Sequence, residues 1–160
     1  MIKLYKRNPD GNQAYHEAWV TEEGVLEHWG VIGEVGEHQQ HSFASDSDEA
    51  DNVASVLRKA RENGFAELPD TALQTLVIEY EEAPDDPQQA ERRQALEGDL
   101  DEFLGWTGLG RCEGSDDSAG TFEVYCRVVD FDIASAAIAA EVENTNYGDF
   151  RRIYQLAAAD

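Results

Sequence analysis

Three glycines at intervals of three residues, the first directly after a tryptophan, constrain this chain more than any other feature of its sequence. The segment reads Trp29-Gly30-Val31-Ile32-Gly33-Glu34-Val35-Gly36. Glycine has no side chain, so it adopts positive φ angles and allows two backbones to approach closely. Inside an apolar strand pattern it marks a bulge, a tight bend or such an approach. The segment therefore predicts a strand that ends in a tightly folded turn.

The sequence around this segment has the pattern of an antiparallel sheet. Ile2 to Arg7 alternates apolar and polar residues, which is the period of a half-buried strand, and in the next strand Tyr15, Glu17 and Trp19 share one face. Asn8-Pro9-Asp10-Gly11 and Glu22-Glu23-Gly24 are typical turn sequences. The predicted strands cover residues 2–7, 14–21, 25–33 and, with a more polar composition, 37–43.

One amphipathic helix is predicted after these strands, over residues 49–63. Ser45-Asp46-Ser47-Asp48 offers several capping side chains, and Val53, Val56, Leu57 and Ala60 repeat at helical spacing. Gly64 has the place of the residue that ends the helix, and Phe65 that of its usual hydrophobic contact.

The second half of the chain has a different order of elements. We predict a strand over 73–80, a helix that Pro87 opens, a hairpin of 109–113 against 121–129, a helix capped by Asp130, and a last strand over 150–156. This order is the split βαβ arrangement of a ferredoxin-like domain. The predicted class is thus α+β, with one domain over residues 1–70 and a ferredoxin-like βαββαβ domain over 72–160.

Residues 1–68 resemble a WGR domain, a small β-rich module named after its Trp-Gly-Arg signature. The resemblance rests on Trp29-Gly30, the aromatic strand Tyr15–Val20, the glycines at 33 and 36, and the helix that follows. In poly(ADP-ribose) polymerases the Trp and Arg of this motif can serve in sensing DNA ends. The roles of Trp and Gly carry over to Trp29 and Gly30, whereas Val31 stands in place of the Arg and cannot bind phosphate.

The second half is similar to a segment that accompanies WGR-like regions in uncharacterised bacterial proteins. The residues that carry this similarity are 104–110, Leu-Gly-Trp-Thr-Gly-Leu-Gly, and 128–134, Val-Val-Asp-Phe-Asp-Ile-Ala. No reaction is implied by it.

The charge of the chain argues against contact with nucleic acid. Twelve Lys and Arg side chains oppose 34 Asp and Glu side chains, a formal net charge of −22. Affinity for phosphates comes from basic side chains, so this surface repels them. Three interpretations stay open: a solvated surface that promotes solubility, complementarity to a basic protein partner, and imitation of a nucleic acid.

The sequence also predicts where in the cell the protein is located. No apolar run reaches the roughly 18 residues of a membrane-spanning helix, and Met1–Arg7 lacks the apolar core of a secretion signal. Cys112 and Cys126 fit reduced thiols in the cytoplasm. Placed on the two arms of one hairpin, they are expected to be offset along the ladder, which disfavours a disulfide.

Several residues could carry chemistry, and each also has a purely structural interpretation. His38 and His41, with His28, Glu34 and Glu37 nearby, could bind a divalent metal, but residues three apart on a strand face opposite ways. Solvated histidines at a strand edge are the favoured interpretation, and no metal is predicted.

The second half holds weaker candidates of the same kind. Gly105-x-x-Gly108-x-Gly110 resembles a phosphate loop, but it runs from helix into strand, the reverse of the order that phosphate binding needs. Cys112 lacks a histidine base anywhere in this half. The segment 114–120 lacks the ligand order of a calcium loop and is predicted to be a hairpin tip.

The sequence therefore predicts a cytoplasmic, non-catalytic protein without cofactor or membrane segment. We expect it to bind another protein, for which a basic partner is one option, and the second sheet could also form a homodimer. Trp29 and Trp106 are the candidate partner-binding residues. The alternatives are a nucleic-acid-associated regulator acting through the WGR-like half and, behind it, a hydrolase or transferase.

Overall fold

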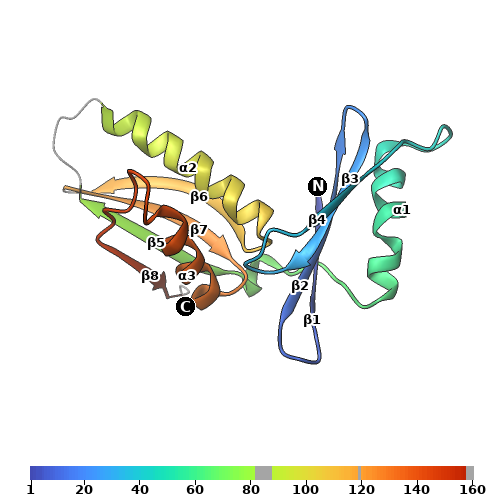
Figure 1. Ribbon diagram of the computed structural model, residues 1–160, viewed down its shortest axis with the longest axis horizontal. Helices are drawn as coiled ribbons and strands as arrows, with labels where there is room; N and C mark the ends of the chain where they lie inside the picture. Colours follow the sequence, from blue (N-terminus) through green and yellow to red (C-terminus); the bar gives the residue numbers. More distant parts are fainter. Residues whose placement is uncertain (82–87, 119, 158–160) are drawn as a thin grey trace. The chain divides into compact units, whose positions relative to one another are not determined.

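The chain folds into two compact units, Met1–Pro69 and Asp70–Asp160, each built around its own sheet (Figure 1). The computed structural model describes residues 1–81, 88–118 and 120–157. These residues form two antiparallel four-stranded sheets and three α-helices, which confirms the predicted α+β class. Within the same ranges, no helix has the length and apolar composition needed to cross a membrane.

The first unit is an antiparallel sheet whose strands are neighbours in chain order, β1-β2-β3-β4, with α1 packed along one face (Figure 1). Its elements are β1 (Ile2–Arg7), β2 (Gln13–Thr21), β3 (Gly24–Val31), β4 (Glu37–His41) and α1 (Glu49–Glu62). Burial of apolar side chains between sheet and helix is the main source of stability here. The buried core comprises Leu4, Ala18, Val25, Val53, Leu57 and Ala60.

Both ends of α1 follow the predicted capping chemistry. The Asp48 carboxylate accepts a hydrogen bond of 2.8 Å from the backbone N–H of Asp51, which satisfies one of the unpaired donors of the first turn. At the other end Gly64 has a φ of 91°, and the N–H of Phe65 donates to the carbonyl of Ala60 at 3.1 Å. Phe65 packs against the core, as predicted.

The second unit has the element order β-α-β-β-α-β. After a short 3₁₀ turn (Asp70–Ala72) come β5 (Gln74–Glu81), α2 (Gln88–Trp106), β6 (Gly110–Ser118), β7 (Thr121–Val128), α3 (Phe131–Val142) and β8 (Arg152–Leu156). The strands lie in the order β6-β7-β5-β8, and every neighbouring pair is antiparallel. Asp130 caps α3 through its carboxylate, as predicted.

Two predicted strand boundaries in this unit are wrong by more than one residue. The hairpin arm predicted to end at residue 113 continues to Ser118, so most of the segment predicted as a hairpin tip belongs to β6. The last strand begins at Arg152 rather than at residue 150. Pro87, the predicted start of α2, lies outside the described residues.

Both helices of the second unit cover the same face of its sheet. The Arg92 guanidinium of α2 lies 5.5 Å from the ring centroid of Tyr80, and the backbone N–H of Phe131 in α3 donates to the Gln74 side chain. Tyr80 and Gln74 alternate in β5 with residues of the opposite face. The buried side chains of the covered face are Leu76, Ile78, Tyr80, Phe122, Val124, Cys126 and Val128.

Candidate functional site

The glycine turn after β3 folds tightly against Tyr15. A Cβ atom on Gly30 would lie 2.9 Å from the Tyr15 hydroxyl oxygen, and one on Gly36 would lie 1.9 Å from the carbonyl oxygen of Trp29. Gly33, between them, has a φ of 90°. Close approach at Gly30 and Gly36 and a positive φ at Gly33 therefore explain the spacing of the three glycines.

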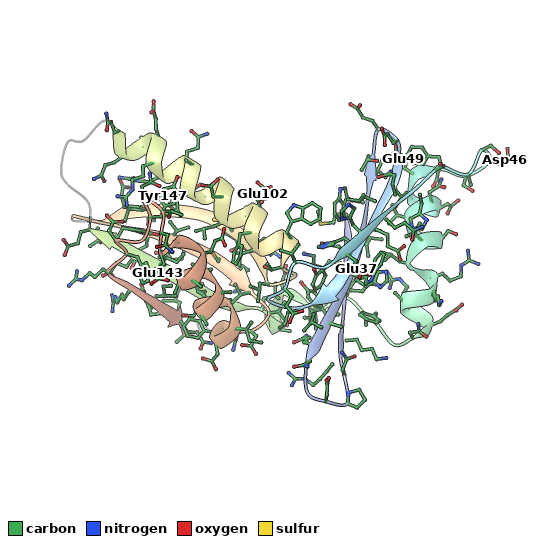
Figure 2. The ribbon with its side chains drawn as sticks, in the orientation of Figure 1. Glu37, Asp46, Glu49, Glu102, Glu143 and Tyr147 are labelled. Atoms are coloured by element: carbon green, nitrogen blue, oxygen red, sulfur yellow. The ribbon has the colours of Figure 1, made fainter. Side chains whose placement is uncertain are left out.

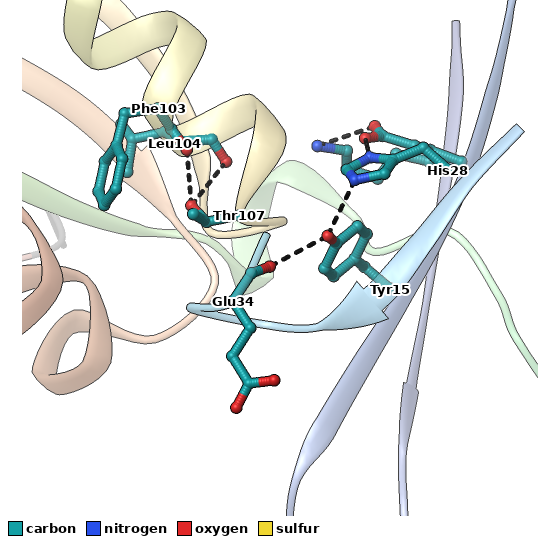
Figure 3. A network of polar contacts seen from close by, with 8 residues as sticks. Tyr15, His28, Glu34, Phe103, Leu104 and Thr107 are labelled. Atoms are coloured by element: carbon teal, nitrogen blue, oxygen red, sulfur yellow. Dashed lines mark hydrogen bonds and ion pairs between the residues drawn. The ribbon is translucent and has the colours of Figure 1, made fainter. Parts of the chain in front are cut away.

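Tyr15 belongs to a buried chain of polar side chains on the sheet face opposite α1 (Figure 3). Lys3 Nζ lies 2.9 Å from Glu17 Oε2, and His28 donates from Nδ1 to Glu17 Oε1 at 2.7 Å. His28 Nε2 lies 3.2 Å from the Tyr15 hydroxyl, which donates to the carbonyl oxygen of Glu34 at 3.1 Å. The chain thus links β1, β2 and β3 to the glycine turn.

The side chains in this chain of contacts are buried, which fits a role in stabilising the fold. Tyr15 and His28 are fully buried and Glu17 is 2% exposed. Burial is the main cause that raises the pKa of Tyr15 to about 12, and the N–H of Gly36, hydrogen-bonded to the hydroxyl, opposes it. The Glu17 carboxylate and the His28 imidazole therefore hold the sheet and the turn together through their hydrogen bonds.

The two tryptophans named by the sequence lie in different units. Trp29 is half-buried on the α1 side of β3, where its ring stacks on His16 with centroids 5.8 Å apart. Trp106 is the half-buried last residue of α2. Just beyond it, the Thr107 hydroxyl donates to the carbonyl of Phe103 at 2.7 Å and closes the helix end (Figure 3).

The histidines do not converge on a metal site. His28 faces Glu17 and Tyr15, whereas His41 lies on the other side of the sheet, with its Nε2 2.6 Å from Glu27 Oε2. His16 Nε2 contacts the second oxygen of the same carboxylate at 2.5 Å. Across the described ranges, no group of three or more His, Cys, Asp and Glu side chains could hold a metal ion.

The predicted offset between Cys112 and Cys126 is wrong. They are directly opposite each other on β6 and β7 rather than offset, because β6 contains an irregularity between Cys112 and Gly114 that shifts the register. Both are free thiols. A bulge of this kind depends on the strand partner, so the sequence of one arm does not reveal it.

The face of the second sheet opposite α2 and α3 gathers tyrosines and paired charges. We call it the tyrosine face, and its side chains belong to β5, β7 and β8: Thr75, Val77, Glu79, Glu123, Tyr125, Arg127, Arg152, Tyr154 and Leu156. Val77 is fully buried at its centre, directly between Tyr125 and Tyr154 in the register. The two tyrosines are half-buried, so their rings shield Val77 and remain partly open to solvent.

Glu123 is the acceptor for both tyrosines. Tyr125 donates to its Oε2 at 2.7 Å and Tyr154 to its Oε1 at 2.5 Å. The hydrogen bonds from Tyr154 and then Tyr125 lower the pKa of Glu123, because they favour its ionised form. The same carboxylate raises the pKa of Tyr125 and of Tyr154 to about 12 each. This site holds a negative charge between two rings at neutral pH.

A second carboxylate on this face is neutralised within the chain. Glu79 is 5% exposed, and Arg152 donates to its Oε2 through Nε at 3.1 Å and Nη2 at 2.6 Å. Arg151 Nε lies 3.4 Å from the other oxygen. Arg152 also lies 4.4 Å from the ring centroid of Tyr154. Glu79 thus anchors Arg152 beside the tyrosine.

Part of the tyrosine face could have been read from the sequence. Strict alternation in Thr121–Val128 places Glu123, Tyr125 and Arg127 on one side of a strand. The contribution of Tyr154 depends on β8 pairing with β5, a neighbour distant in the chain.

Comparison with known proteins gives no match to this chain, whether against family models, curated proteins or solved structures.

Proposed function

We propose that the chain is a cytoplasmic, non-catalytic binding protein that recognises a basic segment of another protein through the tyrosine face. The observation that carries the proposal is the Glu123 carboxylate held between the hydroxyls of Tyr125 and Tyr154. A Lys or Arg side chain of the partner pairs with this carboxylate and lies against a tyrosine ring.

We also propose a WGR-like scaffold for the first unit and a ferredoxin-like one for the second. The sheet with one helix and the turn that requires Gly30 and Gly36 support the first assignment. The order β-α-β-β-α-β and the strand order β6-β7-β5-β8 support the second. Function is argued from the site, because such folds serve many functions.

The chemistry of the site favours a cation. A carboxylate has about four lone-pair positions, so two tyrosine donors leave acceptor capacity on Glu123. A charged donor forms stronger hydrogen bonds with an ionised acceptor than a neutral one does, and ring faces attract Lys and Arg. Tyr and Arg are also the side chains most enriched at the energetic centres of protein interfaces. Tyr125, Tyr154 and Arg152 supply both types.

The surrounding charge supports a basic partner over a nucleic acid. The second half of the chain carries six basic and 20 acidic side chains, a formal charge of −14. Acidic side chains such as Glu102 on α2 and Glu143 after α3, labelled in Figure 2, are exposed on this unit. A negative field accelerates the approach of a basic partner and repels phosphates.

Calorimetric titration of the full chain with a lysine-rich peptide tests the proposal, with a serine–glycine peptide of equal length as reference. Glu123→Gln is expected to weaken binding of the lysine-rich peptide about tenfold, a loss of about 1.4 kcal/mol. Glu102→Gln is the matched control, because it removes the same charge from an exposed position on α2. It is expected to change the affinity by less than about twofold.

Three results would overturn the proposal. Equal losses of affinity in Glu123→Gln and Glu102→Gln would show that binding depends on the overall negative charge and not on the tyrosine face. Binding of nicked duplex DNA at low salt would favour the nucleic-acid-associated regulator. A dimer of the free chain that dissociates in Tyr154→Ala would assign the tyrosine face to self-association. Trp29 and Trp106 remain predicted partner contacts, and the same titration tests their variants.

A further inference from the structure

Cys112 and Cys126 have the placement of a disulfide without the bond. They are register partners on the neighbouring antiparallel strands β6 and β7, and both are free thiols. Directly opposed residues of an antiparallel pair have Cα atoms about 4.5–5.5 Å apart. Disulfides span Cα separations of about 4.4–6.8 Å, so no strand has to move to join the two sulfurs.

The two thiols differ in access and in acidity. Cys126 is fully buried under the helices, and Cys112 is half-buried. A hydrogen bond from Cys126 is the largest cause that lowers the pKa of Cys112, and the N–H of Gly114 adds to it, against burial, Glu97 and Asp101. The same contact and burial raise the pKa of Cys126. Cys112 is therefore the thiol that an external reagent meets first, and in its more reactive form.

The backbone beside Cys112 leaves room for adjustment. The irregularity in β6 lies between Cys112 and Gly114, and a Cβ on Gly114 would meet nothing within 4 Å. The backbone N–H of Cys112 donates to the Asp101 carboxylate of α2 at 2.9 Å. Small rotations at this point can bring the two sulfurs to bonding distance without loss of the β6–β7 pairing.

We propose that Cys112 and Cys126 are a site of reversible oxidative modification, where exchange with a low-molecular-weight disulfide converts the thiol pair into a cross-strand disulfide. The Cys112 thiolate attacks one sulfur of the small disulfide, forms a mixed disulfide and releases one small thiolate. Cys126 then transfers its proton and attacks the Cys112 sulfur, which forms the internal bond and releases the second small thiol. The small disulfide is reduced and the protein dithiol is oxidised, so electrons and protons balance.

The test treats the reduced full chain with oxidised glutathione, quenches the reaction with acid and alkylates the remaining thiols before intact-mass measurement. The wild-type chain is expected to lose two hydrogen atoms and both alkylation sites, and digestion should yield the peptides of Cys112 and Cys126 joined to each other. Dithiothreitol should restore both thiols.

Two variants separate the roles of the sulfurs. Cys126→Ser lacks the second nucleophile, so it is expected to retain glutathione on Cys112. Cys112→Ser leaves only the buried thiol of Cys126, so this variant should react with glutathione at least about tenfold more slowly than the wild type. Cys126→Ala serves as a second variant, and circular dichroism establishes that each is folded.

Three outcomes would overturn the proposal. The first is a wild-type chain that stops at the mixed disulfide, with glutathione on Cys112 and Cys126 still open to alkylation, which would show that the pair cannot close. The second is a bond between two chains. The third is equal reactivity of the folded Cys112→Ser variant and the wild type, which would remove the assigned order of attack.

Discussion

The two units place a carboxylate beside a tyrosine in opposite environments. In the first unit Glu17 is buried with His28, Lys3 and Tyr15, and its oxygens are used to hold three strands together. In the second, Glu123 lies near the surface and accepts from two half-buried tyrosines. The same residue types therefore hold strands together where water is excluded, and lie partly open to solvent in the face that we propose for binding.

The glycine turn should give the largest effect, because it completes the buried side of this comparison. In Gly36→Ala the new methyl group meets the backbone of Trp29 at 1.9 Å, which no side-chain rotation relieves. We expect a loss of more than about 4 kcal/mol in the free energy of unfolding, or failure to fold.

Gly98→Ala is the control for this substitution. Gly98 lies in the exposed part of α2 with nothing within 4 Å of an added Cβ, so alanine should stabilise by about 0.5–1 kcal/mol. Urea unfolding measures both variants. A Gly36→Ala protein as stable as Gly98→Ala would contradict the close approach.

The same substitution in each carboxylate tests the comparison directly. Glu17→Gln removes the buried charge between Lys3 and His28, and we expect a loss of about 3 kcal/mol in unfolding free energy. Glu123→Gln, near the surface, should cost less than about 1 kcal/mol. Similar losses in the two variants, measured by urea unfolding, would remove the distinction between the units.

Phenol ionisation separates the two causes that raise the tyrosine pKa values. Tyr15, Tyr125 and Tyr154 titrate near pH 12, the first because of burial and the other two because of Glu123. In Glu123→Gln the pKa of Tyr125 and of Tyr154 should fall towards 10.0, while that of Tyr15 should stay near 12. Phenolate absorbance against pH measures these changes.

The same shifts set the sign of the pH dependence. Each tyrosine has a higher pKa in the folded chain than the unfolded value of about 10, so its contribution to stability is complete below pH 10 and is lost as the pH rises towards 12. Glu123 has a lowered pKa, so its contribution is present above its unfolded value of about 4.3 and is lost as the pH falls through the folded one. Unfolding that is unchanged between pH 10 and 12 would contradict the tyrosine assignments.

The smallest expected effect is that of Trp29→Phe on binding of the lysine-rich peptide. Trp29 packs on His16, and phenylalanine keeps an aromatic ring there. We expect a change in affinity of less than about twofold, well below the effect of Glu123→Gln. A loss as large as that of Glu123→Gln would move the binding surface to the first unit.

Local chemistry could be predicted from the sequence, and register could not. The cap Asp130 and the helix end at Gly64 depend on residues within one turn and were predicted correctly, and the cap of α1 is Asp48, one of the candidates in the segment 45–48. The opposition of Cys112 and Cys126 depends on a bulge, and was predicted wrongly. A bulge arises from the way two strands match, which neither strand encodes alone.

The candidate site divides in the same way. Glu123 and Tyr125 could be placed on one face from alternation within β7. Tyr154 joins them because β8 pairs with the edge of β5 that β7 does not occupy. The two paired strands are separated in sequence by more than half of the second unit. Trp29 and Trp106 were singled out because large aromatic residues stand out in a sequence, and their part in binding stays a prediction.

The contact between Tyr15 and the carbonyl oxygen of Glu34 has a consequence for how this segment can vary. The hydroxyl is bound by the backbone of the turn, while the side chains of Glu34 and Val35 point into solvent, the latter 72% exposed. Replacing either side chain should leave the fold intact. Inserting or deleting one residue between Gly30 and Gly36 would move the carbonyl away from Tyr15, so the length of this turn is fixed although its chemical surface is free to change.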